Sequence, residues 1–366
     1  MDALVLSHLR RIAHKLIPLL AAAGVAYSYE AAARDPDPML GLPASVTRIQ
    51  GAPPATAALG KRLFFDTRFS ADAKVSCATC HQPDRAFSDG KPVATGTEGR
   101  AGTRNAPSLI NAAFLTTLFW DGRRRTLEEQ ARDPFVNPNE HGLADEAQLL
   151  DVIARDPAYR QQFADAFAAD DAVVDIDHVT RAIAAFVRTL VAGNSPFDRY
   201  YFGGDASALS ASAINGLAIF RERGQCANCH RMEKDHALFT DHDFHTLAVG
   251  LDRISGRLAQ IVKRAPVPGD GLDRAVLADV EVAELGRFLV TGKPSDIGKF
   301  RTPSLRNVAL TAPYMHDGSI ATLEQTVERE IYYRGLEANR PLVLTTQQKR
   351  DLVEFLRSLT SDALPN

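Results

Sequence analysis

The sequence predicts a nearly all-helical fold, and two features of the chain support this expectation. Several segments repeat apolar side chains at intervals of three and four residues, which places them on one face of a helix. No window shows sustained alternation of apolar and polar residues between turn residues, the pattern typical of strands. We therefore expect a mostly α protein.

The expected helices follow from this periodicity along the chain. The clearest is residues 177–192, where Val179, Ile183 and Phe186 share one face. Residues 345–359 show the same apolar spacing, with Leu352 on the apolar face. Further segments suit helices by the same pattern and by their start and stop residues. These segments are residues 55–65, 146–154, 210–222 and 323–333.

The first 28 residues resemble a secretory signal peptide. Arg10, Arg11 and Lys15 precede an apolar run over residues 16–26, and small residues follow near Ser28. A membrane-spanning helix needs about 20 apolar residues, so we expect cleavage and export to the periplasm without stable membrane insertion. A retained N-terminal anchor stays open as an alternative.

The rest of the 366-residue chain is long enough for two domains. Residues 195–205 contain proline, paired glycines and no helical period, so we place the boundary there, with domains at 29–204 and 205–366. The formal net charge of −3 argues against nucleic acid as a partner. Composition is otherwise that of an ordinary globular protein.

All four cysteines occur in two CxxCH motifs. This spacing is the signature of covalent c-type haem, because the two thiols reach both vinyl groups of one porphyrin and the adjoining histidine binds its iron. Structural zinc takes four ligands, whereas each motif offers three crowded ones, and disulfides would leave both histidines unexplained. We expect two haems c, one in each of two cytochrome c-like domains. The attaching residues are Cys77, Cys80 and His81, and Cys226, Cys229 and His230.

Five further stretches make the chain similar to the bacterial di-haem cytochrome c peroxidase superfamily, including its MauG-type branch, which oxidises residues of partner proteins. They follow one another along nearly the whole chain. The stretches are LGKRLFFD (59–66), RNAPSL (104–109), FWDGR (119–123), RTPSLRN (301–307) and APYMHDGS (312–319).

The resemblance implies different roles for the two haems. The haem held by His81 would bind peroxide, and the haem held by His230 would store or relay electrons. The family places a tryptophan between the haems and an acid over the peroxide site, which match Trp120 and Glu140, with a glutamine between them at Gln130. Cleavage of a bound peroxide needs a group that moves a proton from its inner to its outer oxygen, which a carboxylate can do.

Each of these residues also has a plainer interpretation. A lone tryptophan is often a core aromatic, and Trp120 is the only one in the chain. A loop carboxylate such as Glu140 is often solvated or a helix cap, and Gln130 could lie on an exposed helical turn. His141 replaces a methionine common in the family, and could be a second proton carrier or a loop side chain.

The resemblance also implies a calcium ion between the haems. Asn105, Thr311 and Pro313 match its ligands, one side-chain oxygen and two backbone carbonyls completed by water. His316 could lie where electrons enter or leave the second haem, or be a turn histidine bonded to backbone. His245 has the same two interpretations.

Ordinary members of the family have a histidine that blocks the peroxide haem until the other haem is reduced. No histidine or methionine occurs from Gln82 to Asn105, so we expect an open first iron at rest. For the second iron, the family's usual ligand position falls on Glu330, but the nearby tyrosines suggest Tyr332, with Tyr333 as the alternative. The methionines of the chain fit less well as ligands of the second iron.

The leading interpretation is an enzyme that reduces hydrogen peroxide and draws electrons from a redox partner protein, as in the MauG-type branch, where a tryptophan or tyrosine of the partner is modified. A conventional peroxidase supplied by a small cytochrome or copper protein is the first alternative. A non-catalytic di-haem electron carrier or redox sensor is the second.

Overall fold

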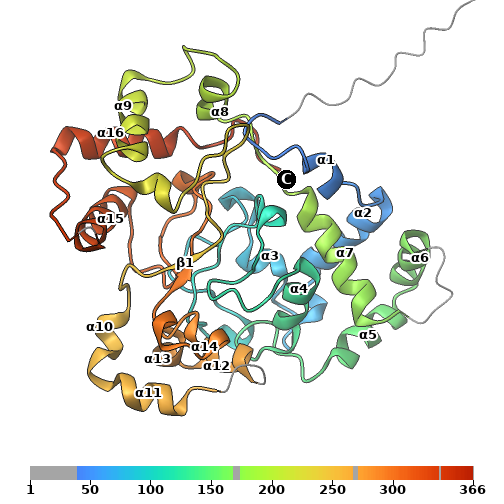
Figure 1. The fold of residues 1–366 in the computed structure, drawn as a ribbon. Helices are drawn as coiled ribbons and strands as arrows, with labels where there is room; N and C mark the ends of the chain where they lie inside the picture. The colour runs from blue at the N-terminus through green and yellow to red at the C-terminus, as the bar shows by residue number, and fades with distance from the viewer. Residues whose placement is uncertain (1–38, 168–173, 267–270, 338, 366) are drawn as a thin grey trace, which may run out of the picture. The chain divides into compact units, whose positions relative to one another are not determined.

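The computed structural model describes residues 39–167, 174–266, 271–337 and 339–365 (Figure 1). The expected signal peptide lies outside these residues. The described part is mostly helical, as predicted, and its strands are two short antiparallel segments, β1 (Phe244–His245) and β2 (Phe300–Arg301). No helix among the described residues has both the length and the apolar character needed to cross a bilayer.

The helices expected from periodicity are all present, with ends that differ by a few residues. The first part of the chain forms α1 (Val46–Ile49), α2 (Pro54–Phe65), α3 (Cys77–Cys80), α4 (Leu127–Val136), α5 (Glu146–Arg155), α6 (Pro157–Ala166), α7 (Ile176–Thr189) and α8 (Pro196–Tyr201). The second part forms α9 (Ala211–Arg221), α10 (Leu251–Ile254), α11 (Leu258–Arg264), α12 (Leu272–Ala278), α13 (Val280–Ala283), α14 (Phe288–Thr291), α15 (Leu323–Glu337) and α16 (Thr346–Arg357).

Helix ends follow local capping chemistry. The Thr126 hydroxyl accepts a hydrogen bond from the Glu129 N–H at 3.1 Å, and the Glu129 carboxylate accepts one from the Thr126 N–H, so a capping box starts α4. Asp175 and Ser210 cap α7 and α9 through single side-chain acceptors. These signals are contained in the sequence, which explains why the helices could be predicted.

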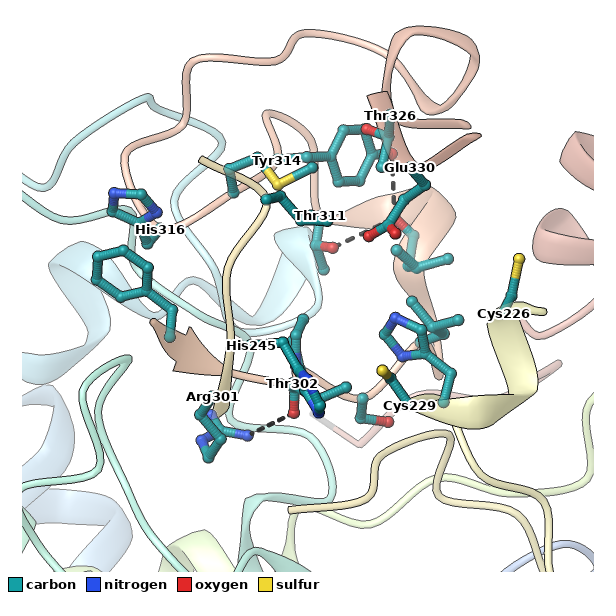
Figure 2. Close-up of a pocket in the computed structure, with 18 of the residues that line it drawn as sticks. Cys226, Cys229, His245, Arg301, Thr302, Thr311, Tyr314, His316, Thr326 and Glu330 are labelled. Atoms are coloured by element: carbon teal, nitrogen blue, oxygen red, sulfur yellow. Dashed lines mark hydrogen bonds between the residues drawn. The ribbon is translucent and has the colours of Figure 1, made fainter. Parts of the chain in front are cut away.

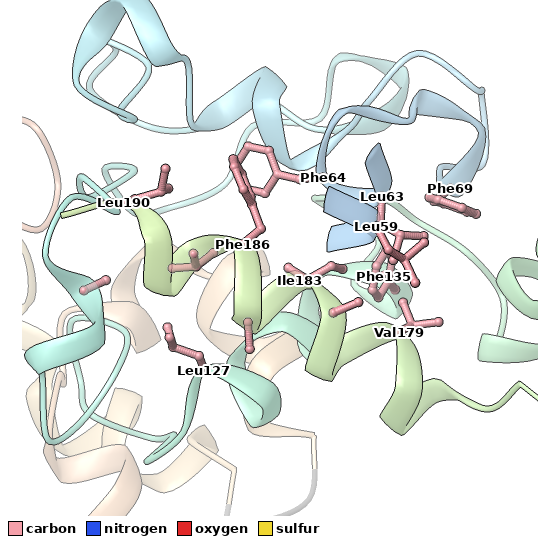
Figure 3. Packing of buried hydrophobic residues seen from close by; sticks show 14 of the residues in the cluster. Leu59, Leu63, Phe64, Phe69, Leu127, Phe135, Val179, Ile183, Phe186 and Leu190 are labelled. Carbon is pink, nitrogen blue, oxygen red and sulfur yellow. The ribbon is translucent and has the colours of Figure 1, made fainter. Parts of the chain in front are cut away.

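The first hydrophobic core lies where α2 crosses α7 (Figure 3). Phe64 and Phe186 meet edge to face with their ring centroids 5.1 Å apart. The crossing is close at Gly60, where an added Cβ would lie 1.8 Å from the Ala182 carbonyl oxygen. Glycine is therefore required for this helix pair to approach.

The second core repeats this arrangement with α9 and α16. Phe220 and Phe355 lie 4.9 Å apart between ring centroids, and a Cβ on Gly216 would lie 2.0 Å from the Asp351 carbonyl oxygen. Phe197 of α8 also packs here, against Phe355. Residues 196–201 thus form a helix that packs with the second core, although the sequence placed them in an irregular boundary segment before residue 205.

Helices α10 to α14 form a third cluster with its own apolar core. Although this cluster belongs to the second part of the sequence, it contacts loops of the first. The Thr103 hydroxyl donates to the Val276 carbonyl at 2.5 Å, and the Asn139 side chain donates to the Leu277 carbonyl at 3.0 Å. Segments far apart in the sequence therefore contact each other here.

Candidate haem cavities and the residues between them

The first cavity, here called the Cys77 cavity, is lined by Cys77, Cys80 and His81. Both cysteines lie on α3, and His81 follows at its end. The His81 Nδ1 lies 3.0 Å from the Phe87 carbonyl oxygen, which orients the ring and leaves Nε2 to bind a metal. Burial lowers the pKa of His81, so its imidazole is neutral, as a ligand must be.

The second cavity, the Cys226 cavity, repeats this arrangement. It is lined by Cys226, Cys229 and His230, and the His230 Nδ1 lies 2.9 Å from the Phe239 carbonyl oxygen. Burial lowers the pKa of His230 too. None of the four cysteines forms a disulfide. Each cavity therefore offers two thiols and one oriented neutral imidazole, which fits a covalently attached haem.

Trp120 lines both cavities. Its indole Nε1 donates to the Asn105 carbonyl at 2.9 Å, and its own carbonyl accepts from the Arg301 N–H at 2.8 Å. These bonds fix the ring at the wall shared by the two cavities. Trp120 thus adjoins both cavities and belongs to none of the hydrophobic clusters of the described residues.

Glu140 and Gln130 both line the Cys77 cavity. The Glu140 backbone is held on both sides, because its N–H donates to Asn137 and its carbonyl accepts from Thr97. Burial raises the pKa of the Glu140 carboxyl to about 7, against the attraction of the Arg123 guanidinium. A carboxyl with this pKa can both accept and release a proton near neutral pH.

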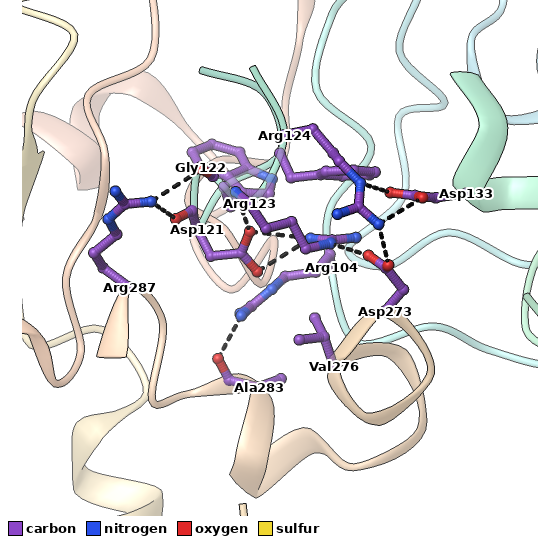
Figure 4. Close-up of polar contacts among 12 residues, drawn as sticks. Arg104, Asp121, Gly122, Arg123, Arg124, Asp133, Asp273, Val276, Ala283 and Arg287 are labelled. Carbon is purple, nitrogen blue, oxygen red and sulfur yellow. Dashed lines mark hydrogen bonds and ion pairs between the residues drawn. The ribbon is translucent and has the colours of Figure 1, made fainter. Parts of the chain in front are cut away.

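Figure 4 shows a network of ion pairs around Arg123, whose positive charge also acts on Glu140. Arg123 pairs with Asp121 at 3.1 Å and also with Asp273, and Arg124 pairs with Asp273 at 2.7 Å. Asp273 comes from α12 in the third cluster. The negative charge of Asp273 also raises the pKa of Glu140. Asp273 was not among the residues expected at the site, because no local sequence motif marks it.

Arg104 was also missed as a site residue. It lines the Cys77 cavity and is only 7% exposed, and its guanidinium carbon lies over the Phe300 ring, 4.8 Å from the ring centroid. One terminal nitrogen donates to the Ala283 carbonyl, while Nε and Nη1 have no hydrogen-bond partner among the described residues. A buried guanidinium with N–H groups that lack hydrogen-bond partners can bind an anion. In a haem-binding cavity, the carboxylates that it would hold are the propionate groups of the haem.

The three residues matched to calcium, Asn105, Thr311 and Pro313, all line the Cys226 cavity. The Asn105 side-chain nitrogen donates to the Lys91 carbonyl at 2.8 Å, so its Oδ1 is the atom suited to a cation. The structure thus brings together residues that lie far apart in the sequence. Oxygen donors are the kind that calcium prefers.

The three histidines of uncertain role are each held by an oxygen atom. His316 and His245 line the Cys226 cavity, and their Nε2 atoms each lie 2.8 Å from a carboxylate, Glu284 and Asp241 respectively. His141 lines the Cys77 cavity with Nδ1 2.8 Å from the carbonyl oxygen of residue 69. Burial lowers the pKa of His141 to about 4, so it stays neutral at pH 7 and is a poor proton carrier there.

The expectation for Tyr332 does not agree with the structure. Tyr332 is 61% exposed, and Tyr333 packs against Tyr332 and the guanidinium of Arg329. Neither tyrosine lines the Cys226 cavity. The residues of α15 that line the cavity lie on another face of the helix, since positions three and four apart share a face. These residues are Thr326, Val327, Glu330, Ile331 and Arg334. Figure 2 shows two of them, Thr326 and Glu330.

Known proteins are similar to this chain in both sequence and fold. The family model for di-haem cytochrome c peroxidase matches residues 54–207. The methylamine utilization protein MauG of Methylorubrum extorquens is 35% identical over 316 residues, covering 84% of this chain and 79% of that protein. The cytochrome c551 peroxidase of Nitrosomonas europaea is also 35% identical, over 84% of this chain and 80% of its own length.

A solved structure agrees with these sequence matches. A MauG-like protein associated with microbial copper homeostasis superposes with a TM-score of 0.69 at 30% identity, covering 90% of this chain and 95% of that protein. To these similarities the geometry adds two pairs of thiols, two oriented histidines and a tryptophan that lines both cavities. The chain belongs to the di-haem cytochrome c peroxidase family, whose enzymes act on hydrogen peroxide.

Proposed function

We propose that this protein is a periplasmic MauG-type enzyme, which reduces hydrogen peroxide at the Cys77 cavity and takes the electrons from a residue of a partner protein. The observation that carries the proposal is the placement of Glu140 in the same cavity as His81, with Trp120 on the wall shared with the Cys226 cavity. An electron carrier has no use for an acid in this position.

The chain's own residues have separate tasks in this reaction. Glu140 takes the proton of peroxide's inner oxygen and returns it to the outer oxygen, which leaves as water. Gln130 orients the peroxide by hydrogen bonding. Each haem, when bound, supplies an iron that can hold oxidising equivalents. Trp120 shortens the path of the electrons, since its indole adjoins both cavities.

One observation favours the MauG-type branch over a conventional peroxidase. Residues 82–105 contain no histidine or methionine that could block the first iron. The relatives do not discriminate between these two branches, because MauG and cytochrome c551 peroxidase match this chain at the same 35% identity.

The partner in this proposal is a protein with an oxidisable tryptophan or tyrosine. A small cytochrome or copper protein would take its place in a conventional peroxidase. We further propose two haem domains, at 29–204 and 205–366, and a calcium ion held by Asn105, Thr311 and Pro313 near the shared wall. Support for calcium comes from the placement of these three residues on one cavity.

The test is the optical and electron paramagnetic resonance (EPR) spectrum of the ferric protein, before and after one equivalent of peroxide without reductant. We expect a high-spin signal from the first haem that converts directly to a long-lived oxidised form. A response that requires prior half-reduction would indicate a conventional peroxidase. No response in either state would indicate a carrier.

A further inference from the structure

A stack of aromatic rings connects the histidine of the second CxxCH motif to the end of α8. The Nδ1 of His230 lies 2.9 Å from the carbonyl oxygen of Phe239. The Phe239 ring packs against the Phe197 ring, with their centroids 5.2 Å apart. The Phe197 ring in turn stacks on the Tyr201 ring, with centroids 5.3 Å apart and an interplanar angle of 20°. One hydrogen bond and two ring contacts therefore separate His230 from a tyrosine.

The inner part of this stack is closed to solvent, whereas its outer end is not. Phe197 and Phe239 are both fully buried in the second core. Tyr201 is only half-buried and packs against this core from its edge. The guanidinium carbon of Arg221, an exposed residue, lies 5.9 Å from the centroid of the Tyr201 ring. The stack thus runs from a haem-binding residue to a phenol at the surface.

Buried polar contacts hold α8 in place. The Asp198 carboxylate pairs with the Arg306 guanidinium through two contacts of 2.9 Å, and neither side chain is more than 1% exposed. Asp198 also accepts a hydrogen bond from the Ser195 hydroxyl at 2.9 Å. A bidentate pair of this kind fixes the geometry of the segment that carries it. Phe197 and Tyr201 lie one helical turn apart on this segment, so their rings share one face.

Tyr201 is the residue of this stack that can be oxidised by one electron. A phenol can give up an electron together with its hydroxyl proton, whereas the rings of Phe197 and Phe239 carry no such proton and can serve only as a bridge. Phe202 also packs on Tyr201, with ring centroids 5.1 Å apart, but it too lacks a hydroxyl. Tyr200 is a half-buried neighbour on α8 that is not part of the stack.

We propose that Tyr201 is the surface residue that passes electrons to the second haem. This inference rests on the proposed function, in which hydrogen peroxide is the oxidant. In each step the O–H bond of the Tyr201 phenol breaks, one electron passes through the stack to the oxidised second haem, and the proton passes to water. A tryptophan or tyrosine of the partner protein then returns one electron and one proton, which restores the phenol. Two such steps supply the two electrons that one peroxide consumes.

The test is freeze-quench EPR of the ferric holoprotein after one equivalent of hydrogen peroxide, without partner protein. Samples are frozen while the oxidised form decays, when no partner restores the phenol. We expect a radical signal that narrows in protein made with ring-deuterated tyrosine, which identifies a tyrosyl radical. Tyr201→Phe keeps the stacked ring and should abolish this signal and slow the decay. In the wild type, mass spectrometry should locate the adduct of a nitrone spin trap at Tyr201.

Two further variants separate this path from a general disturbance of α8. Tyr200→Phe is the matched control, because it removes a neighbouring phenol outside the stack, and it should leave the radical signal unchanged. Phe197→Leu keeps the Tyr201 phenol but interrupts the stack, so the radical should form more slowly while two haems per chain are retained. A radical signal that persists in Tyr201→Phe, or one that is lost in Tyr200→Phe, would overturn the proposal.

Failure of this inference differs from failure of the proposed function. The function depends on the response of the haems to peroxide, whereas the inference depends on where the radical forms afterwards. If peroxide converts the haems and no radical forms at Tyr201, the enzyme stands and the inference falls. If the haems do not respond to peroxide, both fall, because Tyr201 then has no oxidant.

Discussion

The protonation state of Glu140 should control the rate at which the protein reacts with peroxide. Glu140 must be ionised to accept the first proton, and burial raises its pKa from 4.5 to about 7. A raised carboxyl pKa favours the neutral acid, so the active carboxylate is lost as the pH falls through about 7. The rate should therefore rise with pH and level off above neutrality.

The size of the effect follows from this pKa. Two pH units below a pKa about 1% of a carboxyl is ionised, so at pH 5 the rate should be roughly a hundredfold below its plateau. With the ordinary value of 4.5, most of the carboxyl would still be ionised at pH 5. The shift corresponds to about 3 kcal/mol between the two protonation states, and its main cause is the enclosure of Glu140 by protein.

Stopped-flow absorbance of the first haem after mixing with peroxide, from pH 5 to pH 9, measures this rate. Glu140→Gln should keep both haems, lower the plateau by roughly a hundredfold or more, and abolish the pH dependence. Glu98→Gln is the matched control, since Glu98 is an exposed carboxylate paired with Arg100. A pH-independent rate in the wild type, or an unchanged rate in Glu140→Gln, would refute the assigned role.

Four further predictions concern other parts of the site and the fold. Asp273→Asn removes a charge that raises the pKa of Glu140, so the midpoint of the same stopped-flow pH profile should move below 7. Trp120→Phe should retain both haems but slow the peroxide-induced EPR change at the second haem, by about tenfold or more if the indole relays electrons. Removing the proposed calcium with a chelator should slow the same change, and added Ca²⁺ should restore it; metal analysis showing no bound calcium would contradict the site. Gly216→Val should lower the melting temperature, because its Cβ would meet a backbone oxygen and overpacking typically costs about 1–3 kcal/mol.

Much of this protein could be predicted from short stretches of its sequence. The CxxCH motifs indicate haem attachment because the chemistry requires both thiols and the histidine within five residues. Helices such as α7 follow from apolar spacing and caps, which act over one or two turns. These features depend on neighbours in the chain, so they could be inferred before any packing was known.

Other features depend on which segments meet in space. Asp273 reaches Arg123 only because α12 packs beside the Cys77 cavity. The pKa of Glu140 depends on the same enclosure, which sequence spacing does not encode. Asn105, Thr311 and Pro313 were matched to calcium by family resemblance alone, and the fold is what brings all three to one cavity.

The clearest difference between what the sequence predicted and what the tertiary structure shows lies on α15. Sequence patterns near its end suggested Tyr332, because tyrosine is a known kind of iron ligand and two tyrosines occur there. The tertiary structure turns Glu330 to the cavity and Tyr332 to solvent. The sequence determines that a helix and two haem-attachment sites exist, since both depend on local chemistry. The rotation of that helix is decided by the packing of distant segments, and with it which side chains line the Cys226 cavity.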